Sequence, residues 1–126
     1  MKYTVTLLSI ACVCGCVATP EELRSKPATA ELTSGLSAKH VALCIAKHWE
    51  DPVPGWRPLP VTMRPSRNGY FVFVKGHSGA TFLVDVNRVP KGSETKFFRA
   101  QSEIYSVGSS ANLANMALEH TVTTCQ

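Results

Sequence analysis

Two neighbouring segments rich in β-branched and aromatic residues restrict the fold of this chain more than any other feature. Residues 70–75 (YFVFVK) and 80–87 (ATFLVDVN) both have the composition of strands. The residues between them, Gly76-His77-Ser78-Gly79, form a short glycine-bounded loop, which predicts an antiparallel hairpin. In the second strand, alternation predicts one face with Phe82, Val84 and Val86 and an opposite face with Thr81, Leu83 and Asp85.

The rest of the predicted domain adds helices and further strands to this hairpin. Ser37 is a suitable N-cap for a helix that continues to about Trp49. Residues 61–64 and 94–100 are predicted strands, and residues 109–120 a last helix. The expected fold is therefore α+β: an antiparallel sheet of three to four strands with an N-terminal and a C-terminal helix, in the order αββββα. This single domain is expected to occupy residues 36–126.

The second face of the predicted sheet needs a cover. Residues 70–74 are apolar in both alternating sets, and Phe97 and Phe98 put an aromatic ring on each side of their strand. Two short helices cover one face only. The other face would be covered by the proline-rich residues 52–60, by strong curling of the sheet or by a partner, and the first of these is favoured slightly over a partner.

The N-terminus has the pattern of an export signal. Lys2 precedes an apolar stretch at residues 4–13, which is too short to span a bilayer. The sequence Val13-Cys14-Gly15-Cys16 follows, and it resembles the lipobox of bacterial lipoproteins, with Cys16 as the lipidated residue. Two alternatives stay open: lipidation at Cys12, which Ala11 precedes, and an ordinary secretory signal cut nearby.

The resemblance to bacterial lipoproteins implies a location and an anchor. Residues 1–15 would be a signal peptide, and Cys16 would carry a thioether-linked diacylglycerol and an acyl chain such as palmitate on its amine. Val17, rather than Asp, follows the lipidated residue, which implies sorting to the outer membrane, on its periplasmic face, in a Gram-negative host. Residues 16–35, rich in Thr, Ser, Pro and Glu, are expected to be a flexible tether that lifts the domain off the membrane.

Removal of the signal peptide also simplifies the cysteine count. Cys12 and Cys14 leave with the signal and Cys16 is lipidated, so Cys44 and Cys125 remain. In an oxidising exported compartment these two residues are expected to form one disulfide. They are 81 residues apart, a loop for which the chain-entropy model gives about 4 kcal/mol of stabilisation.

Charge and motif patterns give little support to other classes of function. The net charge of +4 is mild and is not concentrated in Lys/Arg runs, so nucleic acid is not an expected partner. His40, Cys44 and His48 share a helical spacing that can present metal ligands, but Cys44 is needed for the disulfide and no metal is predicted.

No catalytic residues and no cofactor are predicted either. His77 and Ser78 are adjacent in a hairpin loop, so their side chains diverge and do not form a triad with Asp85. The remaining carboxylates are scattered at positions that look solvated, rather than paired across a cleft as glycoside hydrolysis requires. The residues considered for such a pair are Glu50, Asp51, Asp85, Glu94, Glu103 and Glu119.

The strongest candidate for a binding site is the loop of residues 49–59 (WEDPVPGWRPL) and the cations near it. Trp56 and Arg57 are residue types common at interface hot spots, and Arg64 and Arg67 extend the positive edge. An equally weighted alternative is that Trp56 caps the core. We expect a lipid-anchored, non-enzymatic protein that binds another protein or an envelope component, as an inhibitor, immunity or assembly accessory lipoprotein. A small cell-wall hydrolase and a purely structural envelope protein are the alternatives.

Overall fold

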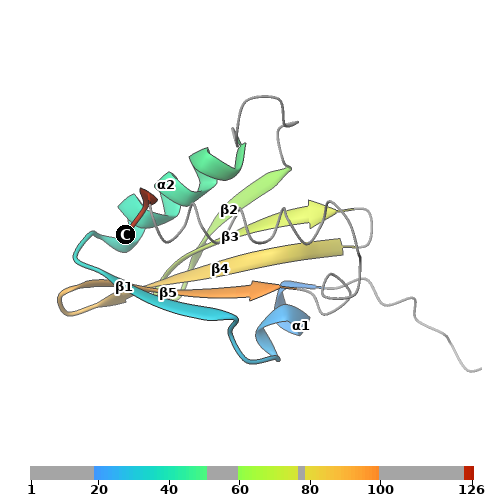
Figure 1. Ribbon diagram of the computed structural model, residues 1–126, viewed down its shortest axis with the longest axis horizontal. Coiled ribbons are helices and arrows are strands. Elements are labelled where there is room, and N and C mark those ends of the chain that lie inside the picture. The colour runs from blue at the N-terminus through green and yellow to red at the C-terminus, as the bar shows by residue number, and fades with distance from the viewer. Residues whose placement is uncertain (1–18, 51–59, 77–78, 100–123) are drawn as a thin grey trace, which may run out of the picture.

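The strands of the described residues pair into one antiparallel five-stranded sheet in the order β1-β5-β4-β3-β2 (Figure 1). The computed structural model describes residues 19–50, 60–76, 79–99 and 124–126. Its elements are α1 (Pro20–Arg24), β1 (Ala30–Ser34), α2 (Ala38–Glu50), β2 (Val61–Ser66), β3 (Gly69–Gly76), β4 (Gly79–Val89) and β5 (Gly92–Arg99). The predicted α+β class is therefore confirmed.

The predicted hairpin forms the centre of the sheet. Strands β3 and β4 pair antiparallel, with Val72 opposite Val84 and Phe73 opposite Leu83. A bulge between Val74 and Lys75 shifts the register near the end of the hairpin. The side-chain alternation expected from the sequence is confirmed from Phe82 to Val86 of β4, where Val84 is fully buried beneath α2 and Asp85 points to the other face.

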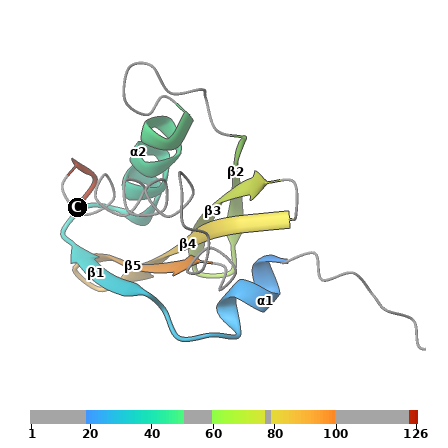
Figure 2. The same cartoon turned by 45° about the vertical axis from the view of Figure 1, so that its right-hand side comes forward.

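Helix α2 covers one face of the sheet and forms the main core with it (Figure 2). The hydroxyl of Ser37 accepts a hydrogen bond from the backbone N–H of His40 at 3.2 Å, as expected of an N-cap. The apolar stripe of the helix is buried, and Trp49 meets Phe82 edge to face with 4.9 Å between ring centroids. This stripe fixes the helix on the sheet.

The segment predicted to be a tether is instead part of the fold between residues 20 and 34. It contains α1 and the edge strand β1, and this strand brings the sheet to five strands rather than the three to four expected. Strand β1 pairs with β5, with Leu32 opposite Thr95. The composition of this segment suggested that it has too little apolar surface to fold. Its side chain Leu23 is nevertheless buried, at 3% exposure, because it packs against Leu83 and Phe98.

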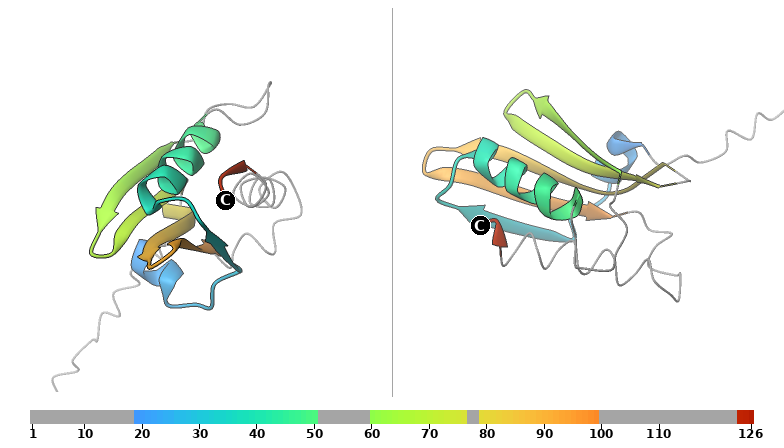
Figure 3. Two further views of the ribbon diagram at one scale, coloured as in Figure 1. Left: turned by 90° about the vertical axis from the view of Figure 1, so that its left-hand side faces the viewer. Right: turned by 90° about the horizontal axis from the view of Figure 1, so that it is seen from above.

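Helices α1 and α2 lie on opposite sides of the sheet (Figure 3). The order of the described elements is αβαββββ, rather than the αββββα expected. The helix expected at residues 109–120, the signal peptide with Cys16, and most of the proline-rich loop lie outside the described residues. Near the C-terminus, Cys125 is buried against α2.

Candidate functional site

The four predicted partner-binding residues fall into two groups. Trp56 and Arg57 lie outside the described residues. Arg64 is exposed in the edge strand β2, opposite Phe71 of β3, and therefore lies on the sheet face away from α2. Arg67 is exposed in the turn between β2 and β3. The structure thus places one arginine on a sheet face and the other at a turn.

The sheet face away from α2 carries a pair of aromatic rings. Phe71 and Phe73 stack with 5.8 Å between ring centroids and 16° between ring planes. Both rings are half-buried, and they pack beside the buried cluster of Leu23, Leu83 and Phe98. The question raised by the sequence, what covers this face, has a partial answer: α1 covers the part over β4 and β5.

An ion pair attaches α1 to this face. The guanidinium of Arg24 donates from Nε to Oδ2 and from Nη2 to Oδ1 of Asp85, each at 2.8 Å. The Asp85 side chain is only 18% exposed, so the expectation that it is solvated is wrong. The Asp85 hydrogen bonds raise the pKa of Arg24 above its ordinary value, against the lowering effect of desolvation. The guanidinium also lies 4.8 Å from the centroid of the Phe71 ring.

Sequence reasoning missed this ion pair, although two signals were available. Thr19 and Glu22 form a capping box with Pro20 at the first helical position, a pattern visible as TPEE in the sequence. A helix that begins there places Leu23 and Arg24 in the same turn. Asp85, in the middle of a strand between apolar neighbours, then needs a cation, because a half-buried carboxylate is costly without one.

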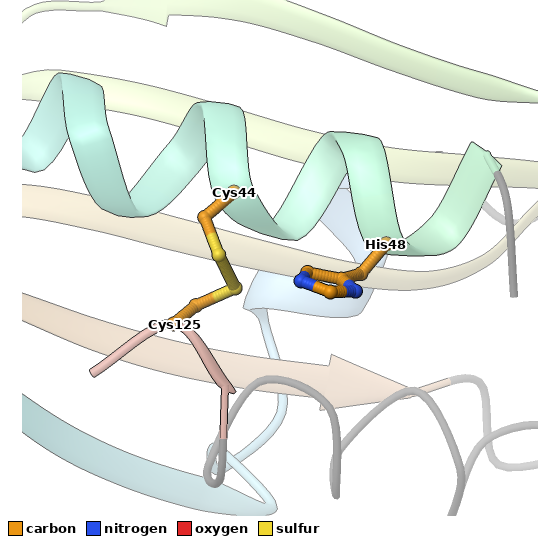
Figure 4. Close-up of side chains that lie close together, drawn as sticks. All are labelled: Cys44, His48 and Cys125. Atoms are coloured by element: carbon orange, nitrogen blue, oxygen red, sulfur yellow. A yellow bond between two sulfur atoms is a disulfide. The ribbon is translucent and has the colours of Figure 1, made fainter.

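The predicted disulfide between Cys44 and Cys125 is present, and His48 lies beside it (Figure 4). Cys44 and His48 are one helical turn apart on α2, and the candidate ligand atoms of the three residues lie within 4.8 Å of one another. Thiolate, not disulfide sulfur, is the usual metal ligand, so the bonded pair is not a metal site. His40, which the spacing placed in the same row, is exposed at the start of α2.

Three of the other residues considered for catalysis, Asp85, Glu50 and Glu94, belong to the described part of the chain. Asp85 binds Arg24, while Glu50 is exposed at the end of α2 and Glu94 belongs to β5. His77, Ser78, Asp51, Glu103 and Glu119 lie outside the described residues. The structure therefore leaves the expectation of no catalytic residue untested for these positions.

A shallow hollow lies beside the turn between β4 and β5. It is lined by Thr33, Ser34, Gly35, Val89, Lys91 and Ser93. These residues supply hydroxyls and one ammonium group, a set suited to holding a small polar group rather than to acid–base catalysis. Neither Arg64 nor Arg67, the two predicted partner-binding residues that the structure describes, lines it.

Comparison with known proteins gives no relative on which function could be based. No family model, no curated protein and no solved structure matches the chain. Among the described residues, no helix has the length and apolar character required to cross a bilayer. The case for function therefore depends on the residues themselves.

Proposed function

We propose that this chain is a lipid-anchored protein of the bacterial envelope that binds another protein or an envelope component and does no chemistry of its own. The observation that carries this proposal is the Cys44–Cys125 disulfide, which agrees with the export-type sequence pattern of residues 1–16. Disulfides of this kind form and persist in oxidising, exported compartments. The disulfide and the lipobox-like Val13-Cys14-Gly15-Cys16 thus favour the same destination.

A binding role is supported by what the charged side chains do. The half-buried carboxylate of Asp85 is held by two hydrogen bonds from Arg24, so it serves to attach α1. Arg64 and Arg67 are exposed, and they follow Trp56 and Arg57 closely in the sequence. Exposed arginines that follow a proline-rich sequence suit recognition of an acidic protein surface or of phosphate groups.

The anchor is tested by comparing Cys16→Ala with Cys12→Ala in cells. The first change should abolish the lipid mass on the mature chain and release the protein from the membrane fraction. The second should leave both unchanged, because Cys12 departs with the signal peptide. Continued membrane association of Cys16→Ala would refute lipidation at this residue. Density separation of inner and outer membranes then tests the outer-membrane assignment based on Val17.

The binding role is tested by photo-crosslinking in living cells from a probe that replaces Trp56. A discrete protein adduct would identify the partner and assign this loop to its recognition. The purified chain should also show no cell-wall or ester hydrolysis. Hydrolysis abolished by His77→Ala, with folding unchanged, would replace this proposal with an enzymatic one.

A further inference from the structure

The part of the sheet face that α1 leaves uncovered has a distinct composition. On β3 it carries the stacked rings of Phe71 and Phe73, and on β2 their register partners are Arg64 and Thr62. The register shift after Val74 skips Thr81 on β4, so alternation along β3 continues and places the exposed Lys75 on the same face. We call these residues, Thr62, Arg64, Phe71, Phe73 and Lys75, the Phe71–Phe73 surface.

Helix α1 is fixed next to this surface. Leu23 is buried between Leu83 and Phe98, and Arg24 contacts both Asp85 and the ring of Phe71. Helix α1 lies on the same side of the sheet as the Phe71–Phe73 surface, opposite α2 (Figures 1 and 3). The first residue of the folded domain is therefore on the side of the sheet that carries this surface.

The distance along the chain from α1 to the proposed lipid anchor is short. The N-cap of α1 is Thr19, and only Val17 and Ala18 separate it from Cys16. Even fully extended, three residue steps span only about 11 Å. The polar layer of a bilayer leaflet is about 5–8 Å thick. An anchor at Cys16 therefore keeps α1 next to the headgroups, and the sheet face beside α1 is the one closest to them.

The chemistry of the surface fits such a position. Half-buried aromatic rings have an apolar body that suits the boundary between headgroups and acyl chains. Arg64 and Lys75 flank the rings with positive charge, which anionic headgroups attract. The neighbouring carboxylate of Asp85 is already paired with Arg24, so it does not oppose this attraction.

We propose that the Phe71–Phe73 surface docks on the anionic phospholipid surface of the membrane that holds the anchor. The proposal rests on lipidation of Cys16. Docking there lays the sheet on the membrane with α2 facing away from it. Lipid is favoured over a protein partner because the short link to Cys16 brings lipid headgroups to this side of the domain.

The test uses the full lipidated protein in vesicles of phosphatidylethanolamine and phosphatidylglycerol, with a benzoylphenylalanine photo-crosslinker at one of two sites. One probe replaces Phe73, and the matched control replaces Leu43, which is 51% exposed on α2. Irradiation should give at least a tenfold excess of lipid adducts at position 73 over position 43. A probe at Thr62, the register partner of Phe73, should repeat the result if the first replacement unfolds the domain.

Charge reversal provides a second readout. Arg64→Glu together with Lys75→Glu should lower the yield of lipid adducts at position 73 or 62 at least threefold, and replacing phosphatidylglycerol with phosphatidylcholine should do the same. Equal lipid labelling at positions 73 and 43, or only protein adducts at 73 in cells, would overturn docking. The intact mass of the protein before irradiation separates the proposed lipid anchor from the proposed docking. A chain without lipid refutes both. A lipidated chain that is labelled equally at positions 73 and 43 refutes docking alone.

Discussion

Replacing Arg24 with Ala should lower the free energy of unfolding by about 2 kcal/mol. Hydrogen bonds to a charged group contribute about 1.5–3 kcal/mol when they are well made and partly buried. Arg24 makes two such bonds to Asp85 at 2.8 Å, with side-chain exposures of 29% and 18%. The contact with Phe71 adds about 0.5 kcal/mol, but the site is partly exposed, so water that replaces Arg24 beside Asp85 offsets more than half of this sum and leaves about 2 kcal/mol.

Urea and thermal unfolding of the chain with its disulfide intact would measure this change. For a domain of about 100 residues, 2 kcal/mol corresponds to a fall in Tm of roughly 8 °C. Glu21→Ala is the matched control, since its carboxylate is 3.9 Å from Arg24 and 80% exposed. This control should change the stability by less than about 0.5 kcal/mol.

A double-mutant cycle with Asp85→Ala isolates the interaction itself. The combined loss should be smaller than the sum of the two single losses by about 1–2 kcal/mol, because both changes remove the same bonds. If Arg24→Ala is as neutral as the Glu21 control, and the cycle shows no coupling, then the Arg24–Asp85 pair does not attach α1 to the sheet. The packing of Leu23 would then be left to hold residues 20–24, and the argument from the short link to Cys16 would lose its main support.

Two further predictions concern the closure of the fold and one backbone position. Replacing both Cys44 and Cys125 with Ala should lower the free energy of unfolding by about 4 kcal/mol, because the disulfide closes a loop with a sequence separation of 81 residues; a loss below about 1 kcal/mol in urea would contradict this loop-closure argument. Gly92→Ala should cost at least about 2 kcal/mol, since its φ is +141° and a Cβ would lie 2.0 Å from the backbone oxygen of Ser34. Gly35→Ala, whose Cβ would meet nothing within 4 Å, is the control, and equal thermal stability of the two variants would refute the steric argument.

The central elements could be predicted because their patterns are strong and local. Residues 70–75 and 80–87 became β3 and β4, and α2 begins next to the predicted N-cap, Ser37. The Cys44–Cys125 bond followed from simple counting once the leader cysteines were set aside. The period of apolar residues predicts the strands, the N-cap predicts the start of the helix, and the even number of remaining cysteines predicts the disulfide. None of these predictions needs knowledge of the tertiary structure.

The edge of the fold could not be read in the same way. Strand β1 has the alternating pattern of a half-buried strand, but Leu32 is its only large apolar residue, so composition suggested a tether. Its stability depends on pairing with β5, and the paired residues are 59 to 67 positions apart along the chain. The ion pair on this face was missed for the same reason. Asp85 was expected to be solvated because its partner, Arg24, belongs to the segment that was expected to be a tether.

That correction changes which surface a protein partner could use. With a 20-residue tether, every face of the domain would be open to partners, and Arg64 could belong to either a protein site or a lipid site. With α1 fixed to the sheet, Arg64 lies on the side nearest the proposed anchor, whereas α2, with Leu43 exposed, faces away. Lipid adducts at position 73 together with protein adducts at position 56 would therefore show that the predicted positive edge serves two ligands. Arg64 would contact the membrane, and Trp56 and Arg57 would contact the protein partner.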